Sequence, residues 1–199
     1  MLRKSKVRFF YLALVLLLAG AAPAQALPAA VAPSLRYTLA MPAPQTHYFE
    51  VKMELGGFPA EYTDVKMPVW APGSYLVREF AKNVEGFRAR TAGGQELAME
   101  KISKNTWRVR HPKQSSFQVS YRVYAFELTV RTSFLDADHG YLNGSSVFMY
   151  PADNKALGST VVVQPATGWA QVSTALRPGP EKFTYKAANY DELADSPIE

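Results

Sequence analysis

The sequence contains no cysteine among its 199 residues. Disulfide bonds, thiol chemistry and a lipid-modified N-terminal cysteine are therefore excluded. Without disulfides, the folded chain must be stabilised by an ordinary hydrophobic core. Apolar residues make up 48% of the sequence, and the length suits one domain, which typically needs about 100 to 200 residues.

No apolar run is long enough to span a bilayer as a helix. The longest covers residues 9–22, which is 14 residues, whereas about 20 are needed. Four basic residues and no acidic residue precede this run, and the small-residue triplet Ala24-Gln25-Ala26 follows it. This order is typical of a signal peptide, residues 1–26, that is cleaved after Ala26. The alternative is an uncleaved N-terminal anchor.

The excess of positive charge belongs to this leader. The whole chain has 22 basic and 17 acidic residues and a net charge of +5. Removal of residues 1–26 leaves 173 residues with 18 basic and 17 acidic side chains. A net charge near +1 provides no reason to expect binding to nucleic acid or to an anionic membrane. We therefore expect a periplasmic or secreted protein with neither of these partners.

Short segments of alternating polar and apolar residues dominate residues 34–199, which follow an Ala/Pro-rich spacer at residues 27–33. No stretch longer than about ten residues has the helical period. Strands are predicted at 35–39, 48–55, 65–69, 84–91, 96–102, 106–110, 117–125, 128–134, 147–150, 160–164 and 183–187. Gly93-Gly94 predicts a two-residue hairpin, and short helical turns are predicted at 74–82 and 190–194. The pattern favours an all-β domain, an antiparallel β-sandwich with one or two short helical turns.

Known catalytic motifs are absent from the sequence. Its three histidines, His47, His111 and His139, have no second histidine three or four residues away, so the His-Glu-x-x-His zinc motif is missing. Serine nucleophile elbows and glycine-rich loops that bind phosphate or dinucleotides are also missing. We therefore expect no catalytic residue, metal ligand or cofactor in this chain.

The densest polar cluster is Asp136-Ala137-Asp138-His139-Gly140-Tyr141-Leu142-Asn143-Gly144. Carboxylates and an imidazole suit divalent cations, but an EF-hand loop starting at Asp136 would need Gly and Glu where Tyr141 and Val147 stand. Three interpretations stay open, namely a metal loop, a loop that places side chains beside a ligand or partner, and a plain connection. We expect the loop to project from one end of the sandwich, with Tyr141 and Asn143 as candidate substrate contacts.

A second motif surrounds Trp70, in the segment from Met67 to Phe80. Two prolines flank the tryptophan, Gly73 permits a chain reversal, and Ser74 is suited to cap a short helix. One interpretation is a strand-to-helix corner in which Trp70 and Tyr75 plug the edge of the sandwich. The other is a rigid loop that lines a cleft with the same two aromatic side chains.

The segment Pro68-Val69-Trp70-Ala71-Pro72-Gly73-Ser74-Tyr75 resembles the P-x-W-x-P-G-S-Y signature of the M61 peptidases, the glycyl aminopeptidase family. Other segments agree with the family in the same order, namely residues 47–51, 121–125, 130–132, 139–144, 168–169 and 190–197. The resemblance spans nearly the whole chain after the leader. It implies the N-terminal β domain that, in this family, precedes a thermolysin-like zinc catalytic domain and a PDZ domain.

No catalytic residue is carried over by this resemblance, because the sequence lacks the family's zinc motif. Zinc is implied only for a catalytic domain, and we expect no aminopeptidase activity from this chain alone. Its partner would be a catalytic domain of the M61 type, in cis or from an adjacent reading frame, as if the chain were a gene fragment. The first hypothesis is thus a noncatalytic domain whose loops shape the substrate cleft. The alternative is a free-standing periplasmic binding or interaction β-sandwich.

Export of the chain is expected to remove residues 1–26, because small residues occupy both recognition positions before the cleavage site. N-terminal sequencing of the exported protein should begin at Leu27. A protein that still starts at Met1 and sediments with membranes would instead support the uncleaved anchor.

Overall fold

The computed structural model describes residues 31–199, so the expected leader lies outside the described residues. The strands of the larger sheet are β1 (Ser34–Ala40), β2 (Tyr48–Gly56), β4 (Val84–Thr91), β7 (Phe117–Tyr124), β11 (Ser159–Gln164), β12 (Arg177–Pro178) and β13 (Thr184–Ala187). Those of the smaller sheet are β3 (Tyr62–Lys66), β5 (Met99–Ser103), β6 (Thr106–Arg110) and β10 (Tyr150–Pro151). Two further strands, β8 (Phe134–Leu135) and β9 (Gly140–Tyr141), form a separate hairpin. Short helices are α2 (Gly144–Val147), α3 (Tyr190–Ala194) and the 3₁₀ turns η1 (Pro44–Thr46), η2 (Phe80–Asn83) and η3 (Ala152–Asn154).

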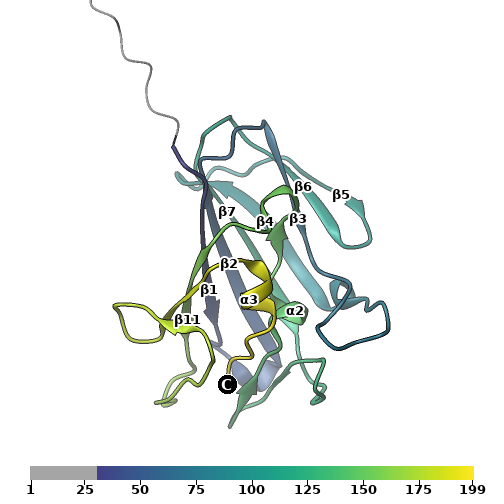
Figure 1. Ribbon diagram of the computed structural model, residues 1–199, viewed down its shortest axis with the longest axis vertical. Helices are drawn as coiled ribbons and strands as arrows, with labels where there is room; N and C mark the ends of the chain where they lie inside the picture. Colours follow the sequence, from purple (N-terminus) through teal and green to yellow (C-terminus); the bar gives the residue numbers. More distant parts are fainter. Residues whose placement is uncertain (1–30) are drawn as a thin grey trace, which may run out of the picture.

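The two sheets form the two layers of a β-sandwich (Figure 1). The strand order is β12-β13-β11-β1-β2-β7-β4 in the larger sheet and β10-β3-β6-β5 in the smaller. Buried apolar side chains from both sheets form one core cluster, in which Phe87 of β4 stacks on Trp107 of β6 with ring centroids 5.0 Å apart. Between residues 31 and 199, no helix is long and apolar enough to cross a membrane. The predicted all-β sandwich is confirmed for the described residues.

The predicted purely antiparallel arrangement is wrong at one position. β1 pairs with β11 in parallel, with Arg36 opposite Thr160, whereas its other neighbour β2 is antiparallel. The larger sheet is therefore mixed. Alternation of polar and apolar residues reports which face of a strand is buried, and it carries no information on the direction of the neighbouring strand.

The hairpin near Gly93-Gly94 exists, but its geometry differs from the prediction. Gly94 donates its N–H to the Thr91 carbonyl, and Thr91 donates to Gln95, so three residues rather than two form the loop. Only Gly94 has positive φ, at 87°. This is the three-residue hairpin in which a single glycine at the left-handed position completes the turn.

Two predicted strands are wrong. Residues 128–134 form a loop whose apolar side chains Leu128 and Val130 are exposed, and only Phe134 enters a strand. Of the predicted strand 147–150, only Tyr150 enters a strand, since Val147 ends helix α2 and the following Phe148 and Met149 are fully buried without belonging to a sheet. A short apolar run buried on all sides has no periodicity that separates helix from strand.

The helical turn predicted at 190–194 is confirmed as α3, where the Asn189 side chain caps the helix by accepting the N–H of Glu192. The helix predicted at 74–82 is wrong except for η2 at its end. Ser74 does not cap a helix, because residues 75–79 are not helical, and its Oγ instead accepts the backbone N–H of Leu76 while its carbonyl accepts the indole N–H of Trp70. The backbone between these residues is consequently a loop.

Three buried tyrosine hydroxyls hold the segment Val147–Met149 inside the core. Tyr121 donates to the Val147 carbonyl at 3.0 Å and accepts the Met149 N–H at 2.9 Å. Tyr190 donates to the Phe148 carbonyl at 2.7 Å, and Tyr37 donates to the Met149 carbonyl at 2.6 Å. All three consecutive carbonyls are thus paired without a sheet ladder. Burial raises the pKa of each of these hydroxyls, so all three stay protonated donors at neutral pH.

Tyr121→Phe should destabilise the fold, because it leaves the Val147 carbonyl and the Met149 N–H buried without partners. The expected cost is about 1–3 kcal/mol for each unpaired group. Urea denaturation followed by tryptophan fluorescence measures it. Tyr124→Phe is the matched control, since Tyr124 lies in the same strand but is partly exposed. Equal stability of the two variants would refute the role assigned to the buried hydroxyls.

Candidate functional site

A row of aromatic rings lies at the end of the sandwich where β2 begins and β7 ends. Its members, in order of contact, are Tyr48, Tyr124, His47, Phe126, Phe134 and His139. Centroids of successive rings are 5.4, 6.1, 3.8, 5.2 and 6.5 Å apart in that order. We call these six residues the aromatic ladder. None of the six side chains is fully buried, so the ladder is part of the molecular surface.

Strand register and one strained residue place these rings together. Tyr48 and Tyr124 lie directly opposite each other in the β2–β7 pair. His47 has φ of 65°, which turns the chain from η1 into β2, and its carbonyl accepts the Ala125 N–H. The Nδ1 atom of His47 lies 2.6 Å from the Leu135 carbonyl oxygen. Because a carbonyl only accepts, Nδ1 carries the proton and attaches the β8–β9 hairpin to this end of the sheet.

Charged groups extend the ladder along the outer face of the larger sheet. The Arg122 guanidinium lies 4.3 Å from the centroid of the Tyr48 ring. Glu85 accepts hydrogen bonds from the Tyr48 hydroxyl and from Arg122, both at 2.8 Å. These two bonds lower the pKa of the Glu85 carboxyl, and the same bond to Glu85 raises the pKa of Tyr48. The carboxylate therefore stays ionised and orients both the phenol and the guanidinium.

The loop 136–144 is less exposed than the sequence suggests. Asp136 folds back on its own turn, where its carboxylate accepts the backbone N–H groups of Asp138 and His139, and these bonds lower its pKa. Only the tip of the loop projects, because Leu142 and Gly144 are buried. The expectation that the whole loop projects from the sandwich is therefore wrong.

Helix α3 packs so closely on this loop that residue 144 must be glycine. A Cβ at Gly144 would lie 2.3 Å from the Leu193 carbonyl oxygen. Next to it, Leu142 pairs with Ile198 through two backbone hydrogen bonds, and the His139 Nε2 lies 2.9 Å from a carboxylate oxygen of Glu199. The last residues of the chain therefore lie beside the aromatic ladder, at the lower end of the molecule in Figure 1.

The two candidate substrate contacts in this loop differ in their surroundings. Asn143 caps α2, since its Oδ1 accepts the backbone N–H of Ser145 at 3.1 Å and also the Ser145 hydroxyl. Tyr141 is half-buried in β9, where it pairs with Phe134 of the ladder. Asn143 thus has a structural role, and contact of either residue with a substrate stays a prediction.

The segment Val69–Arg78, here called the Trp70 loop, projects from the smaller sheet. The Arg78 N–H donates to the Val69 carbonyl and closes the loop, while the Trp70 indole N–H donates across it. Trp70 is 52% exposed and Tyr75 is fully exposed. The interpretation in which these two rings plug the edge of the sandwich is therefore wrong. Trp70 instead lines an open cavity of about 360 Å³ together with Tyr150 and Tyr190.

Exposed apolar side chains are concentrated in the Trp70 loop and around the ladder. Among residues 31–199, nine of the thirteen exposed large apolar residues belong to the segments 69–77 and 124–130. Helix η2 lies between these segments, since Lys82 lines one cavity with Val77 and another with Phe126. Exposed apolar side chains thus flank η2 on both sides, and clusters of this kind mark an interaction site more often than a solvated face.

The residues of the described chain do not fit a zinc site. Three residues of the types His, Cys, Asp or Glu come together nowhere in the range 31–199 in a way that could hold a metal ion. His47 and His139 lie at the ladder end of the sandwich, whereas His111 is buried next to Phe117 at the opposite end. In loop 136–144, the Oδ1 atom of Asp136 accepts both backbone N–H groups, so this oxygen has a structural role in the turn.

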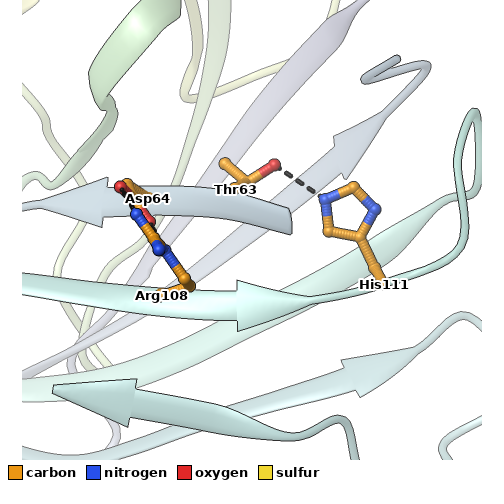
Figure 2. Close-up of polar contacts among 4 residues, drawn as sticks. All are labelled: Thr63, Asp64, Arg108 and His111. Atoms are coloured by element: carbon orange, nitrogen blue, oxygen red, sulfur yellow. Dashed lines mark hydrogen bonds and ion pairs between the residues drawn. The ribbon is translucent and has the colours of Figure 1, made fainter. Parts of the chain in front are cut away.

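His111 is a structural residue of the smaller sheet. Its Nδ1 lies 3.0 Å from the Pro112 carbonyl and its Nε2 lies 2.8 Å from the Thr63 hydroxyl, which Figure 2 shows as a dashed line. Nδ1 donates to the Pro112 carbonyl, because a carbonyl only accepts, and Nε2 shares a hydrogen bond with the Thr63 hydroxyl. Beside it, Arg108 and Asp64 form a bidentate ion pair across β3 and β6 (Figure 2).

Sequence reasoning found the Trp70 loop and the 136–144 loop but missed the ladder. Its members are spread from residue 47 to residue 139, and no local pattern joins them. The signal in the sequence was the pair Tyr48 and Tyr124, which strand alternation places on the outward face of the sheet. Aromatic rings on that face do not fill the core, so they point to another role.

Asn143→Ala should lower the free energy of unfolding by about 0.5–2 kcal/mol, because the cap of α2 is lost. Asn143→Asp is the matched control, since a carboxylate oxygen can accept the same Ser145 N–H. Thermal unfolding of the two variants measures the difference. If both variants lose the same stability, the capping role is disproved.

Comparisons with known proteins identify the family of this chain. The model of the peptidase M61 N-terminal domain matches residues 36–199. In the solved aminopeptidase N family protein from Idiomarina loihiensis, the match has 28% identity and a TM-score of 0.75, and it covers 82% of this chain but only 28% of that one. A mutant M1 zinc metallopeptidase from Deinococcus radiodurans with a bound Tyr-Ser-Ala substrate gives 13% identity and a TM-score of 0.48, covering 83% of this chain and 41% of that one. No curated protein sequence matches the chain. The resemblance first noted around Trp70 is thus confirmed, and the chain belongs to the peptidase M61 N-terminal domain family.

Proposed function

We propose that this domain is a noncatalytic part of a zinc aminopeptidase, and that its ladder end packs against a catalytic domain and lines the substrate cleft. The observation that carries the proposal is the exposed aromatic and apolar surface around the ladder. Aromatic residues are enriched in interfaces because they bury a large area with few rotatable bonds. The protein would act in the periplasm or outside the cell.

The position of Glu199 also supports the ladder end of the sandwich as the docking face. Glu199 lies against His139 at the end of the ladder, and its backbone pairs with Ser173. The related protein from Idiomarina loihiensis is longer, since the match covers only 28% of it. In such a longer chain, residues that follow the position of Glu199 would begin beside the ladder. A short connection would then suffice to bring the next domain onto it.

Loop positions support a role at the edge of a cleft. Trp70 and Tyr75 project on the Trp70 loop, and Tyr141 lies in the hairpin that carries the end of the ladder. Tyrosine and tryptophan combine an apolar face with one polar atom, which suits contact with a peptide end without chemistry. Asn143 is a weaker candidate for such contact, because its Oδ1 already accepts two hydrogen bonds.

The second candidate function is a free-standing binding or interaction sandwich. The exposure of Phe126, Leu128 and Val130 in the chain as it stands is compatible with a separate partner. The two functions differ in one consequence, which is whether the ladder stabilises an attached catalytic domain.

A chimera tests the docking function. In the Idiomarina loihiensis relative, residues 34–199 of this chain would replace the matching domain, and Phe126→Ser with Leu128→Ser would then be introduced. We expect a lower unfolding temperature and at least about a tenfold lower kcat/KM on glycyl and alanyl substrates, because the domains lose apolar contact. Met99→Ser with Ile102→Ser is the control, since these residues of β5 are similarly exposed but lie away from the ladder.

The docking function would be overturned if the ladder variant and the β5 control behaved alike in an active chimera. An effect of the ladder variant on KM alone, with an unchanged unfolding temperature, would assign the ladder to substrate contact rather than to domain packing.

A further inference from the structure

An open cavity of about 480 Å³ lies between the Trp70 loop, helix η2 and the β5–β6 turn. Four cationic side chains line it, Arg78, Lys82, Lys101 and Lys104, together with one carboxylate, Glu79. None of these five side chains belongs to the ladder or lines the cavity beside Trp70. The volume is in the range of about 300–1,000 Å³ that is usual for ligand sites.

Three of the four cations have no carboxylate partner. Glu79 pairs with Lys104 at 3.1 Å, and it is the single acidic residue that lines the cavity. Lys101 lies over the Trp107 ring, with its Nζ 4.6 Å from the centroid. Within residues 31–199, Arg78, Lys82 and Lys101 form no ion pair.

Like charges gathered around one cavity repel each other, and an anion bound between them relieves the repulsion. The cavity therefore has an electrostatic preference that the near-neutral net charge of the chain without residues 1–26 does not reveal.

Apolar side chains form the remaining wall of the cavity. Val69, Val77 and Ala81 line it, and Val77 is 77% exposed. A fitting ligand thus carries negative charge and an apolar group next to each other. A peptide in which acidic and apolar residues alternate has this arrangement, because consecutive residues, about 3.3 Å apart along an extended chain, carry the two kinds of side chain.

We propose that this cavity binds an acidic peptide segment, with carboxylates placed against Arg78, Lys82 and Lys101 and an apolar side chain placed against Val69 and Val77. The concave shape favours a peptide over a lipid surface, since a flat bilayer would meet the exposed Tyr75 and Leu76 first and would not enter the cavity. Binding is a property of this chain alone and does not depend on the proposed docking of a catalytic domain.

Fluorescence anisotropy with the full chain tests the proposal. The probe is a fluorescein-labelled peptide of alternating Glu and Leu, and its neutral analogue has Gln in place of every Glu. We expect saturable binding of the acidic probe alone, weakening as salt rises from about 20 to about 200 mM because exposed ion pairs are screened. Equal affinity for the neutral analogue would overturn the proposal.

The double variant Lys82→Gln with Lys101→Gln tests whether the acidic probe binds in this cavity. The double variant should raise Kd for the acidic probe by about fivefold or more, since two exposed charge contacts are lost. Lys182→Gln combined with Lys186→Gln is the matched control, because it removes the same charge elsewhere and Lys182 also lies over an aromatic ring, that of Phe183. An unchanged unfolding temperature shows that both variants are folded. Equal weakening in both double variants would overturn the proposal in favour of nonspecific attraction.

Sedimentation with lipid vesicles distinguishes binding of a peptide from binding to a lipid surface. Sedimentation with phosphatidylglycerol vesicles, and with phosphatidylcholine vesicles as the neutral control, should leave the chain in the supernatant. Sedimentation with phosphatidylglycerol that depends on Lys82 and Lys101, together with no binding of the acidic probe, would assign the cavity to an anionic membrane and overturn the peptide proposal.

Discussion

The fold depends on three tyrosine hydroxyls that satisfy one buried stretch of backbone. Val147, Phe148 and Met149 cross the core outside any sheet, and a chain in this position would leave its carbonyls unpaired. Hydroxyls from β1, β7 and α3 pair with all three carbonyls. Because the donors come from distant parts of the sequence, these bonds also join the larger sheet to the C-terminal helix.

The arrangement of the ladder end follows from this constraint. The buried stretch is preceded by α2 and by the loop 136–144, so these bonds hold the chain at the point where those segments end. Gly144 then permits the close approach of α3, and Leu142 pairs with Ile198. The ladder, the hairpin β8–β9 and the last residues of the chain are consequently held at one end of the sandwich. Hydrogen bonds and backbone pairing restrain this end, and a restrained surface loses less conformational freedom on binding.

Helix η2 separates two surfaces of different chemistry. On one side lies the ladder, which includes the exposed Phe126. On the other side lies the cationic cavity with Arg78 and Lys101. Lys82 belongs to the linings of both cavities. An apolar surface next to a cationic one allows a domain contact and a peptide contact at neighbouring places. The two proposals are therefore compatible in one molecule, although each is tested separately.

The sequence by itself determined the strands with clear alternation, such as β2 and β7, the capped helix α3 and, through the residues around Trp70, the family. These features depend on near neighbours in the chain. The tertiary structure alone decided the parallel pairing of β1 with β11, the course of Val147–Met149, the ladder and the cationic cavity. Each of these requires residues far apart in sequence to meet, and the alternation of a strand specifies which face is buried but not which strand lies beside it.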